Sequence, residues 1–373
     1  MYGVKQLSKS FQDPEIIKKI KTKIHNLADK FVDRKIRICH VCGTHEYTIS
    51  HWGIRSLLPS NIEVIAGPGC PVCICPNEDI EQGIWLAKNG YTLATYGDMA
   101  RVPSNQGSIL TARAEGADIR VVYSFLDVIK LAKSNPQKNI VFFAIGFETT
   151  APTVAIELIN HQIPSNLYIL SAHRLVPPAM SVLVDQPDIP LDGFIAPGHV
   201  SAITGSGIYE SISDQHNVPI VVAGFEPADV MLSILAILQQ LIHSRSKTEN
   251  LYSRVVTREG NKTALTAMDT AYEVVDARWR GIGVIPSSGF EIAKDFSKFN
   301  IRVKEEIPIT GGRDIPKGCR CADIMLGKIY PEDCSLFNSR CTPENPIGPC
   351  MVGNEGTCAI HAKYGGHLDL DSD

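Results

Sequence analysis

The sequence predicts an α/β protein made of two similar parallel-sheet units and a small cysteine-rich domain. Three observations predict this fold class. From residue 36 onward, short apolar runs rich in β-forming residues alternate with helical stretches, which is typical of parallel strands covered by helices. A polar break at residues 134–138 divides the eight runs into two sets of four. Beyond residue 280 the periodicity fades, and cysteine, glycine and proline become frequent.

The size and charge of the chain limit what it can do. Its 373 residues exceed the length at which one hydrophobic core stops growing, so two or three packed units are expected. A net charge of -4 gives no basic field that would favour nucleic acid. The N-terminus carries no signal-peptide pattern, and no apolar run is long enough for a bilayer. We therefore expect a cytoplasmic protein that binds neither nucleic acid nor a membrane.

Residues 1–35 are expected to form an N-terminal amphipathic helix. Asp13 and Pro14 suit the cap and the first turn of a helix, and isoleucine and leucine then recur at helical spacing. The lysines between them form a solvated face. We expect this helix to pack with the C-terminal domain.

The first α/β unit is expected over residues 36–135, and its first strand runs into the pentapeptide CGTHE. A thiolate, an imidazole and a carboxylate within five residues can bind a metal ion or activate the thiol, so Cys42, His45 and Glu46 are candidate site residues. The alternative is a capped turn around a structural cysteine. Cys39 lies within the apolar strand and is interpreted as a core residue.

The second predicted strand runs into GPGCPVCICP at residues 67–76. Cys70 and Cys73 form a Cys-x-x-Cys pair of the kind in which a dithiol and a disulfide interconvert. Half of a zinc site is the alternative, but a redox pair is favoured. Cys75 is a further potential partner, although the pairing of Cys70 with Cys73 is favoured.

The second α/β unit is expected over residues 136–280, where GFETTAP and PGHVSAITG each follow a predicted strand. Glu148 and His199 in these motifs are candidates for proton transfer or for lining a cleft, whereas capping explains the threonines. His173, at another strand end, is interpreted as a satisfied, partly buried histidine. Neither a Walker loop nor a dinucleotide-binding fingerprint follows any strand, so nucleotide binding is not supported.

The expected C-terminal domain, residues 281–373, contains six of the eleven cysteines. In a chain without an export signal, so many cysteines indicate metal or redox chemistry rather than a secreted disulfide framework. Four thiolates suffice for an iron-sulfur cluster and would leave two cysteines over. Zinc is the rival metal, but this segment lacks paired Cys-x-x-Cys ligands, so an iron-sulfur cluster is favoured.

Five motifs, taken in order, resemble one known family. CGTHE, GPGCPVC, GFETTAP, PGHVSAITG and the closing CRC and CTPENPIGPCMVGNEGTC, spread over residues 37–364, look like the hydrogenase maturation protein family HypD. The resemblance implies a scaffold on which iron acquires carbon monoxide and two cyanides before delivery to the large subunit of a nickel-iron hydrogenase. It also implies two partners, a small HypC-type chaperone and HypE, which supplies cyanide.

The same resemblance implies roles for individual residues. Cys42 would be the thiolate that holds the iron of the Fe(CN)2CO unit, with His45 and Glu46 lining the site. Cys70 and Cys73 would form a redox dithiol that exchanges electrons with a four-iron four-sulfur cluster. For the cluster ligands we predict Cys319, Cys334, Cys341 and Cys358, with Cys321 and Cys350 as alternatives, since spacing alone does not choose among the six.

A competing interpretation from another class is a stand-alone thiol-disulfide reductase. It would pass electrons from the late cysteines through Cys70 and Cys73 to a protein substrate. This interpretation leaves the Cys42 thiol without a role. A purely structural metalloprotein is disfavoured because reactive residue types gather at strand ends.

Overall fold

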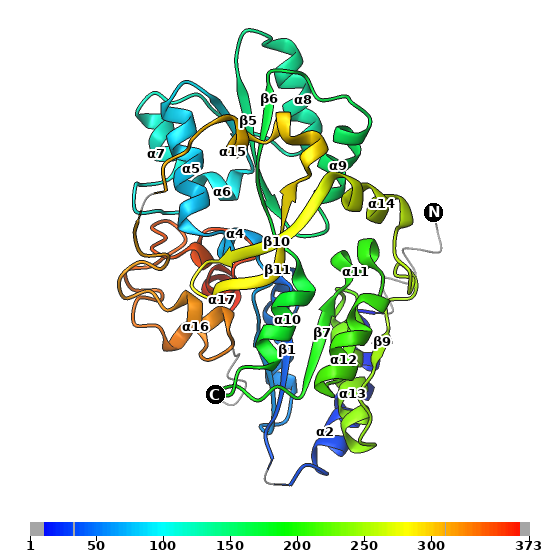
Figure 1. Cartoon of the computed structure of the whole chain (residues 1–373). Coiled ribbons are helices and arrows are strands. Elements are labelled where there is room, and N and C mark those ends of the chain that lie inside the picture. Colours follow the sequence, from blue (N-terminus) through cyan, green and yellow to red (C-terminus); the bar gives the residue numbers. More distant parts are fainter. Residues whose placement is uncertain (1–10, 33, 310, 366–373) are drawn as a thin grey trace.

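The computed structural model describes residues 11–32, 34–309 and 311–365. It contains two parallel sheets flanked by helices, one antiparallel hairpin and a cysteine-rich segment, which we define as residues 311–365. The two sheets lie one above the other in Figure 1. The predicted α/β class with parallel sheets is therefore confirmed.

Sheet A has five strands in the order β2-β1-β7-β8-β9, and sheet B has four in the order β4-β3-β5-β6. All neighbouring strands within the two sheets are parallel. Sheet A comprises β1 (Ile36–His40), β2 (Ile62–Ala66), β7 (Gly193–Pro197), β8 (Ile220–Ala223) and β9 (Thr248–Asn250). Sheet B comprises β3 (Thr92–Thr95), β4 (Ile119–Val121), β5 (Ile140–Gly146) and β6 (Leu167–His173).

The expected division of the strands at residues 134–138 is wrong. β5 pairs directly with β3 across this break, and β1 pairs with β7, more than a hundred residues later. The chain leaves sheet A after β2, builds all of sheet B, and then returns to complete sheet A. Residues 134–138 are only the turn between helix α8 (Phe125–Ser134) and β5. Each α/β unit is thus distinct in space, but sheet A is discontinuous in sequence.

The N-terminal helix α2 (Pro14–Ala28) is capped by the side chain of Asp13, as the sequence predicts. It packs against α13 (Pro227–Ile242), with Ile20 and Ile24 buried in the core beneath sheet A. The two helices lie together in Figure 1. The expected packing with the C-terminal domain is therefore wrong, because the apolar face of α2 is covered by α13.

The predicted boundary at residue 280 falls inside a hairpin. β10 (Tyr272–Trp279) pairs antiparallel with β11 (Gly283–Ile292), and β11 packs on β6 and on α10 (Val176–Val184). Ser171 on β6 donates a hydrogen bond to the carbonyl of Phe290 at 2.6 Å. The residues just after 280 therefore belong with sheet B and not with the cysteine-rich segment.

The remaining helices are short and mostly follow strand ends. Those of sheets A and B are α3 (Gly43–His51), η1 (Ile54–Leu57), α4 (Pro71–Ile74), α5 (Asn77–Lys88), α6 (Gly97–Arg101), α7 (Ile109–Ala114), α9 (Ala151–Ile159), α11 (Gly198–Thr204), η2 (Gly207–Tyr209), α12 (Glu210–His216), α14 (Lys262–Ala271), η3 (Lys294–Phe299) and α15 (Ile301–Lys304). The cysteine-rich segment contains α16 (Cys321–Met325), η4 (Pro331–Asp333), η5 (Pro349–Met351) and α17 (Thr357–Tyr364).

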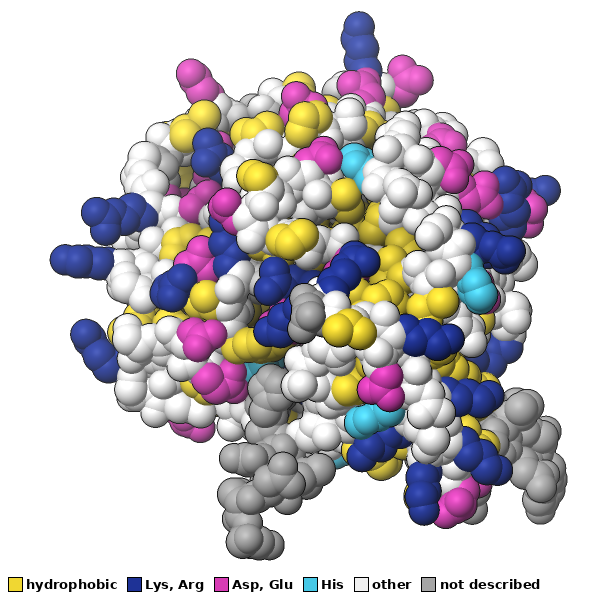
Figure 2. Space-filling view, turned by 90° about the horizontal axis from the view of Figure 1, so that it is seen from below, with side chains coloured by type: hydrophobic (Ala, Val, Ile, Leu, Met, Phe, Trp, Pro, Cys, Tyr) yellow, Lys and Arg dark blue, Asp and Glu magenta, His cyan; other side chains and the backbone are white. Residues whose placement is uncertain are grey.

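The surface is mixed in character. Figure 2 shows lysine and arginine side chains scattered between acidic and apolar ones over one face of the molecule. Within the described part of the chain, every helix is too short or too polar to cross a lipid bilayer.

Candidate functional site

The two cysteine motifs of the first half meet at the carboxyl edge of sheet A. Cys42 follows β1 and stands at the N-terminus of α3, whereas Gly67–Cys70 follows the neighbouring strand β2. The backbone N–H of Gly43 donates to the carbonyl of Gly69 at 3.2 Å. A Cβ atom on Gly69 would clash with the backbone of Cys42, so only glycine permits this close approach. The parallel pairing thus brings CGTHE and GPGCPVC into contact.

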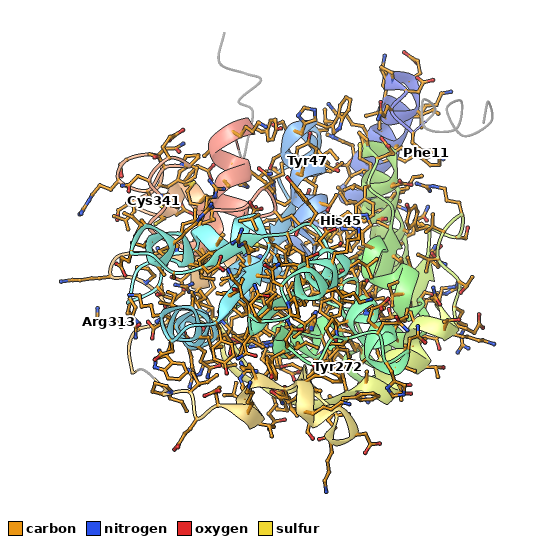
Figure 3. The ribbon with its side chains drawn as sticks, turned by 90° about the horizontal axis from the view of Figure 1, so that it is seen from above. Phe11, His45, Tyr47, Tyr272, Arg313 and Cys341 are labelled. Atoms are coloured by element: carbon orange, nitrogen blue, oxygen red, sulfur yellow. A yellow bond between two sulfur atoms is a disulfide. The ribbon has the colours of Figure 1, made fainter. Side chains whose placement is uncertain are left out.

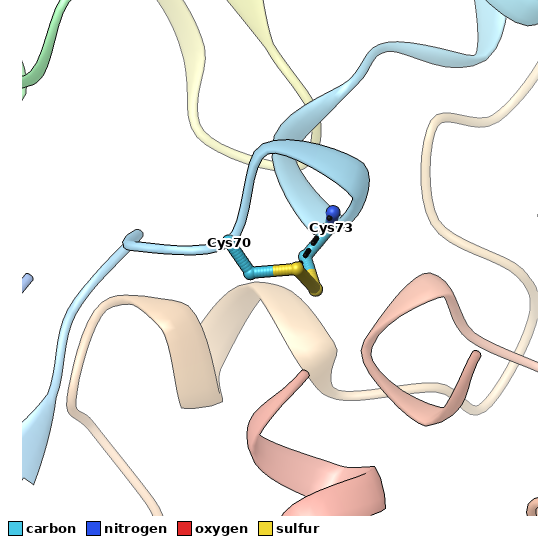
Figure 4. Close-up of a disulfide and its surroundings, with 2 residues drawn as sticks. All are labelled: Cys70 and Cys73. Atoms are coloured by element: carbon cyan, nitrogen blue, oxygen red, sulfur yellow. Dashed lines mark hydrogen bonds between the residues drawn. A yellow bond between two sulfur atoms is a disulfide. The ribbon is translucent and has the colours of Figure 1, made fainter. Parts of the chain in front are cut away.

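Cys70 and Cys73 form a disulfide, which is the pairing that the sequence favours (Figure 4). The bond spans the start of α4, and the sulfur of Cys70 accepts a hydrogen bond from the backbone N–H of Cys73 at 3.2 Å. Cys75 is a free, buried cysteine, and burial raises the pKa of its thiol. Cys75 therefore remains a protonated neighbour of the disulfide.

The Cys42 thiol is 8% exposed and lies between two parts of the chain that are distant in sequence. Burial raises its pKa to about 11, although backbone N–H groups of His45 and Thr44 lower it and the charge of Glu355 raises it further. The Glu355 backbone and side chain lie so close to Gly43 that a Cβ atom there would clash. At neutral pH the thiol keeps its proton until a cation takes the proton's place, which suits a metal-binding sulfur.

His45 is buried and neutral, with one ring nitrogen engaged. Its Nε2 lies 2.9 Å from the carbonyl of Gly224, so this nitrogen carries the proton and donates. Nδ1 is therefore an acceptor, and it has no partner among the described residues. Burial lowers the pKa of His45 to about 3. Figure 3 shows His45 within the molecule. The ring of Phe225 lies tilted against that of His45 and stacks on that of His199.

Glu46 is engaged differently from the expected lining of an iron site. Arg55 binds both carboxylate oxygens, at 2.8 and 2.7 Å, and His40 and His361 donate to them at 2.7 and 3.0 Å. Burial alone would raise the pKa of Glu46, but the Arg55 charge and these hydrogen bonds outweigh it and hold the pKa well below its usual value. Glu46 thus ties α3 to α17 of the cysteine-rich segment.

His361 completes this buried network. Its Nδ1 faces Glu332 at 2.9 Å while its Nε2 faces Glu46, so both ring nitrogens donate to carboxylates. Burial alone would lower the pKa of His361, but the hydrogen bonds to Glu332 and Glu46 raise it. The imidazolium of His361 therefore links the carboxylate of Glu46 on α3 to that of Glu332 in the cysteine-rich segment.

Glu148, from GFETTAP, is a buried acid with half of its carboxyl group free. Oε1 accepts the backbone N–H of Val176 at 3.0 Å, and Oε2 has no partner in the described chain. Burial raises the pKa of Glu148 to about 7. His173 is fully buried rather than partly buried, and its Nδ1 has no partner among the described residues, so the expectation of a satisfied histidine is wrong.

We expect the Glu148→Gln substitution to stabilise the protein at pH 8 but not at pH 4. The folded-state pKa of about 7 lies above the ordinary glutamate value of 4.5, so ionisation of Glu148 removes stability as the pH rises between these values. Glutamine keeps an oxygen for Val176 and cannot ionise. The gain at pH 8 should be on the order of 3 kcal/mol, measured by urea unfolding. Glu344→Gln, at an exposed position, is the control. The prediction would be contradicted if the free energy of unfolding varied with pH in the same way for wild type, Glu148→Gln and Glu344→Gln.

The six late cysteines lie in one compact region. The thiol of Cys321 lies within interaction range of Cys319 and Cys350, and Cys350 lies within range of Cys358. The sulfur of Cys341 accepts the backbone N–H of Ile347 at 3.3 Å, and the adjacent Gly348 touches the sulfur of Cys319. Cys334 is buried and connects to Cys341 through a turn. Figure 3 shows Cys341 in this segment at the side of the molecule.

These cysteines fit an iron-sulfur cluster in their chemistry. Buried thiols in excess of four, with an N–H donor directed at one sulfur, are the environment that such clusters use. Within the described residues, no group of three or more His, Cys, Asp or Glu side chains surrounds a single ion position. The chain of thiol contacts includes Cys319 and Cys358 of the predicted set and both alternatives, so the choice of ligands stays a prediction.

The cysteine-rich segment also borders the disulfide. η5, which carries Cys350, packs against α4, which carries Cys73. The segment reaches the Cys42 region as well, through Glu355 against Gly43 and through His361 on Glu46. Sequence reasoning missed Glu355 and His361, because each is an isolated polar residue whose partner is distant in sequence. It also missed Arg55, the partner of Glu46.

Fold and site together define a class: a two-sheet α/β protein that gathers a free thiol, a disulfide and a cysteine-rich segment at the carboxyl edge of one sheet. The family model HypD, described as "Hydrogenase formation hypA family", matches residues 15–365. The chain therefore belongs to the HypD family of hydrogenase maturation factors.

Curated relatives agree with this family along nearly their whole length. A protein of Methanocaldococcus jannaschii, provisionally named a hydrogenase expression/formation protein, is 46% identical over 95% of this chain and 99% of its own. The hydrogenase maturation factor HypD of Cupriavidus necator is 39% identical over 96% of this chain and 97% of its own. The factor of the same name from Escherichia coli K12 is 41% identical over 89% of this chain and 90% of its own.

Proposed function

We propose that the protein is a scaffold and redox protein for assembly of the Fe(CN)2CO unit of a nickel-iron hydrogenase. The observation that carries this proposal is the Cys42 thiol, buried at the edge of sheet A in contact with the disulfide loop and against the cysteine-rich segment. Family membership supplies the hydrogenase context.

Cys42 is the proposed attachment point for the iron that is being built. A thiolate is a soft ligand, and low-spin iron that carries cyanide and carbon monoxide suits such ligation. The raised pKa of the Cys42 thiol means that iron must displace its proton, which gives the site a pH-dependent affinity. The free Nδ1 lone pair of His45 is available to accept a hydrogen bond or to ligate. The network around Glu46 holds α3 in place rather than binding the iron.

The disulfide and the late cysteines would supply the redox function. Four of the six cysteines would hold a four-iron four-sulfur cluster, which transfers one electron at a time when bound. Reduction of the Cys70–Cys73 disulfide takes two electrons and two protons and yields two thiols. Because η5 packs on α4, the path between the two centres would be short.

The proposed partners follow the family. A small HypC-type chaperone would bind near Cys42 and carry the finished iron unit to the hydrogenase large subunit, and HypE would provide the cyanide groups. The cytoplasm is the proposed location. A stand-alone thiol-disulfide reductase is the second candidate, favoured by the disulfide beside the cysteine-rich segment, but it assigns no role to Cys42.

We expect Cys42→Ala to abolish iron-carbonyl loading while the disulfide and the cluster persist. The protein would be purified anaerobically from cells that co-express the small chaperone and HypE, and infrared spectra would be recorded alongside iron and sulfide analysis. Wild type should show two cyanide bands and one carbonyl band, and the bands of the variant should fall by at least roughly tenfold.

Cys39→Ala is the matched control, since Cys39 lies on β1 and, like Cys42, is a buried, free cysteine. Its bands should equal those of wild type. Bands that survive in Cys42→Ala would remove the scaffold role from this thiol. The thiol-disulfide reductase would be the better proposal if the wild-type protein held a cluster but showed no cyanide or carbonyl bands although both partners were co-expressed.

A further inference from the structure

Arg280 is a buried cation that has no anionic partner among the described residues. Its side chain is among the largest fully buried ones, with 1% of the residue exposed. Nε donates to the carbonyl of Asp314 at 2.7 Å, and Nη2 donates to the carbonyl of Pro103 at 2.9 Å. Nη1 has no partner among the described residues. Both of its bonds therefore go to neutral carbonyl groups.

Such an arrangement is costly unless an anion is nearby. Moving a charged group out of water carries a penalty of several kcal/mol, which proteins normally offset with an opposite charge. Two neighbouring arginines follow this rule, because Arg174 and Arg302 both pair with Asp79, at 2.8 and 2.7 Å. Arg280 does not share this carboxylate. The unpartnered Nη1 of Arg280 therefore indicates that the protein acquires an anion close to this side chain.

The position of Arg280 identifies the source of negative charge. Its backbone N–H donates at 2.8 Å to the carbonyl of Ile74, the residue between Cys73 and Cys75. The next residue, Gly281, lies against Ala322, and a Cβ atom there would approach the Ala322 side chain to 2.7 Å. Ala322 directly follows Cys321. Arg280 therefore lies between the disulfide loop and the late cysteines.

The electrostatic reach of Arg280 agrees with this position. The charge of Arg280 reaches the thiol of Cys321. At Cys75, where burial dominates and raises the pKa, the Arg280 charge also acts in the lowering direction. The guanidinium of Arg280 thus acts on the Cys75 thiol beside the disulfide and on the Cys321 thiol of the cysteine-rich segment.

We infer that Arg280 is the fixed cation that balances the thiolates of the iron-sulfur centre beside Cys321 and raises the reduction potential of that centre. This inference rests on the proposed function as far as the cluster is concerned. Uptake of one electron makes a thiolate-ligated cluster more negative, so a buried positive charge stabilises the reduced form. Arg280 acts as a positioning residue, since it tunes the centre without ligating it.

The test is an anaerobic titration of the purified full-length protein with dithionite as the electron donor, followed by electron paramagnetic resonance. Arg280→Gln should disfavour the one-electron reduced cluster roughly tenfold, which is about 59 mV lower in midpoint potential. Arg278→Gln, two residues away on β10 with a half-exposed side chain, is the control and should leave the potential unchanged. Iron and sulfide content and circular dichroism verify that each variant is folded and loaded.

Arg280→Lys provides a second reading that does not depend on the stability of the glutamine variant. A buried lysine titrates at accessible pH whereas arginine does not, so this variant should have a near-wild-type potential at low pH and a lower one at high pH. A loaded cluster with the same potential in all variants at every pH overturns the role of Arg280 alone. A wild-type protein that holds no iron and sulfide overturns the proposed cluster, and the inferred partner of Arg280 with it.

Discussion

Glu46→Ala is expected to destabilise the protein by about 3–5 kcal/mol, because it leaves the buried Arg55 cation unpaired. The carboxylate also accepts hydrogen bonds from His40, Ser50 and His361, and all of these donors would lose their acceptor together. Urea unfolding of the purified protein measures the loss. Hydrogen exchange in α17 should rise most, because His361 loses its link to α3.

Glu210→Ala is a suitable control for the Glu46 variant. Glu210 pairs with Arg258 on the surface, where both side chains are largely exposed, so its removal should leave the midpoint of unfolding unchanged. A Glu46→Ala protein as stable as this control would show that the network does not hold α3 and α17 together.

The same network should make the wild type sensitive to acid. The pKa of Glu46 is depressed in the folded state, so its contribution to stability is present above the ordinary glutamate value of 4.5 and is lost as the pH falls below it. The Glu46→Ala protein should lack this part of the acid response. The gap in unfolding free energy between wild type and variant should therefore narrow towards low pH.

The strands could be predicted from the sequence, but their grouping could not. Apolar β-rich runs such as residues 140–146 are recognisable because both faces of a parallel strand are buried. Which strands become neighbours depends on where the chain crosses between sheets. The sequence pattern of helix α8 does not tell whether this helix links two sheets or two strands of one sheet. The pairing of β1 with β7 therefore became visible only in three dimensions.

The cysteine motifs of the site were predictable for a related reason. Carboxyl ends of neighbouring parallel strands meet at one edge, so Cys42 and Cys70 had to lie close once β1 and β2 paired. The role of Glu46 was not predictable, since its partner His361 lies 315 residues away. Arg280 was equally hidden, because its significance comes from the absence of a carboxylate among its described partners and not from a motif.

The largest effect on metal content is expected from the late cysteines. We expect Cys319→Ser and Cys358→Ser each to lose nearly all bound iron and sulfide, because these two belong both to the predicted ligand set and to the chain of thiol contacts. Serine keeps the size of the side chain but removes the soft donor. Iron and acid-labile sulfide per chain, measured after anaerobic purification, report the loss.

The remaining four cysteines then separate into two testable pairs. If Cys334 and Cys341 complete the cluster, as predicted, their serine variants lose iron while those of Cys321 and Cys350 retain it. If instead the Cys321 and Cys350 variants lose iron and the Cys334 and Cys341 variants retain it, the ligands are Cys319, Cys321, Cys350 and Cys358, the interacting thiols. Cys75→Ser is the control, since Cys75 is buried and free but lies outside the cysteine-rich segment, and it should keep its iron.

Loss of the cluster should also loosen the cysteine-rich segment itself. This segment contains only short helices, and its buried cysteines supply much of its packing, so metal binding and local folding should be coupled. Limited proteolysis should therefore cut the iron-free serine variants within the segment and spare sheets A and B. A segment equally resistant in iron-loaded and iron-free protein would show that packing against α3 and α4, and not the cluster, holds it in place.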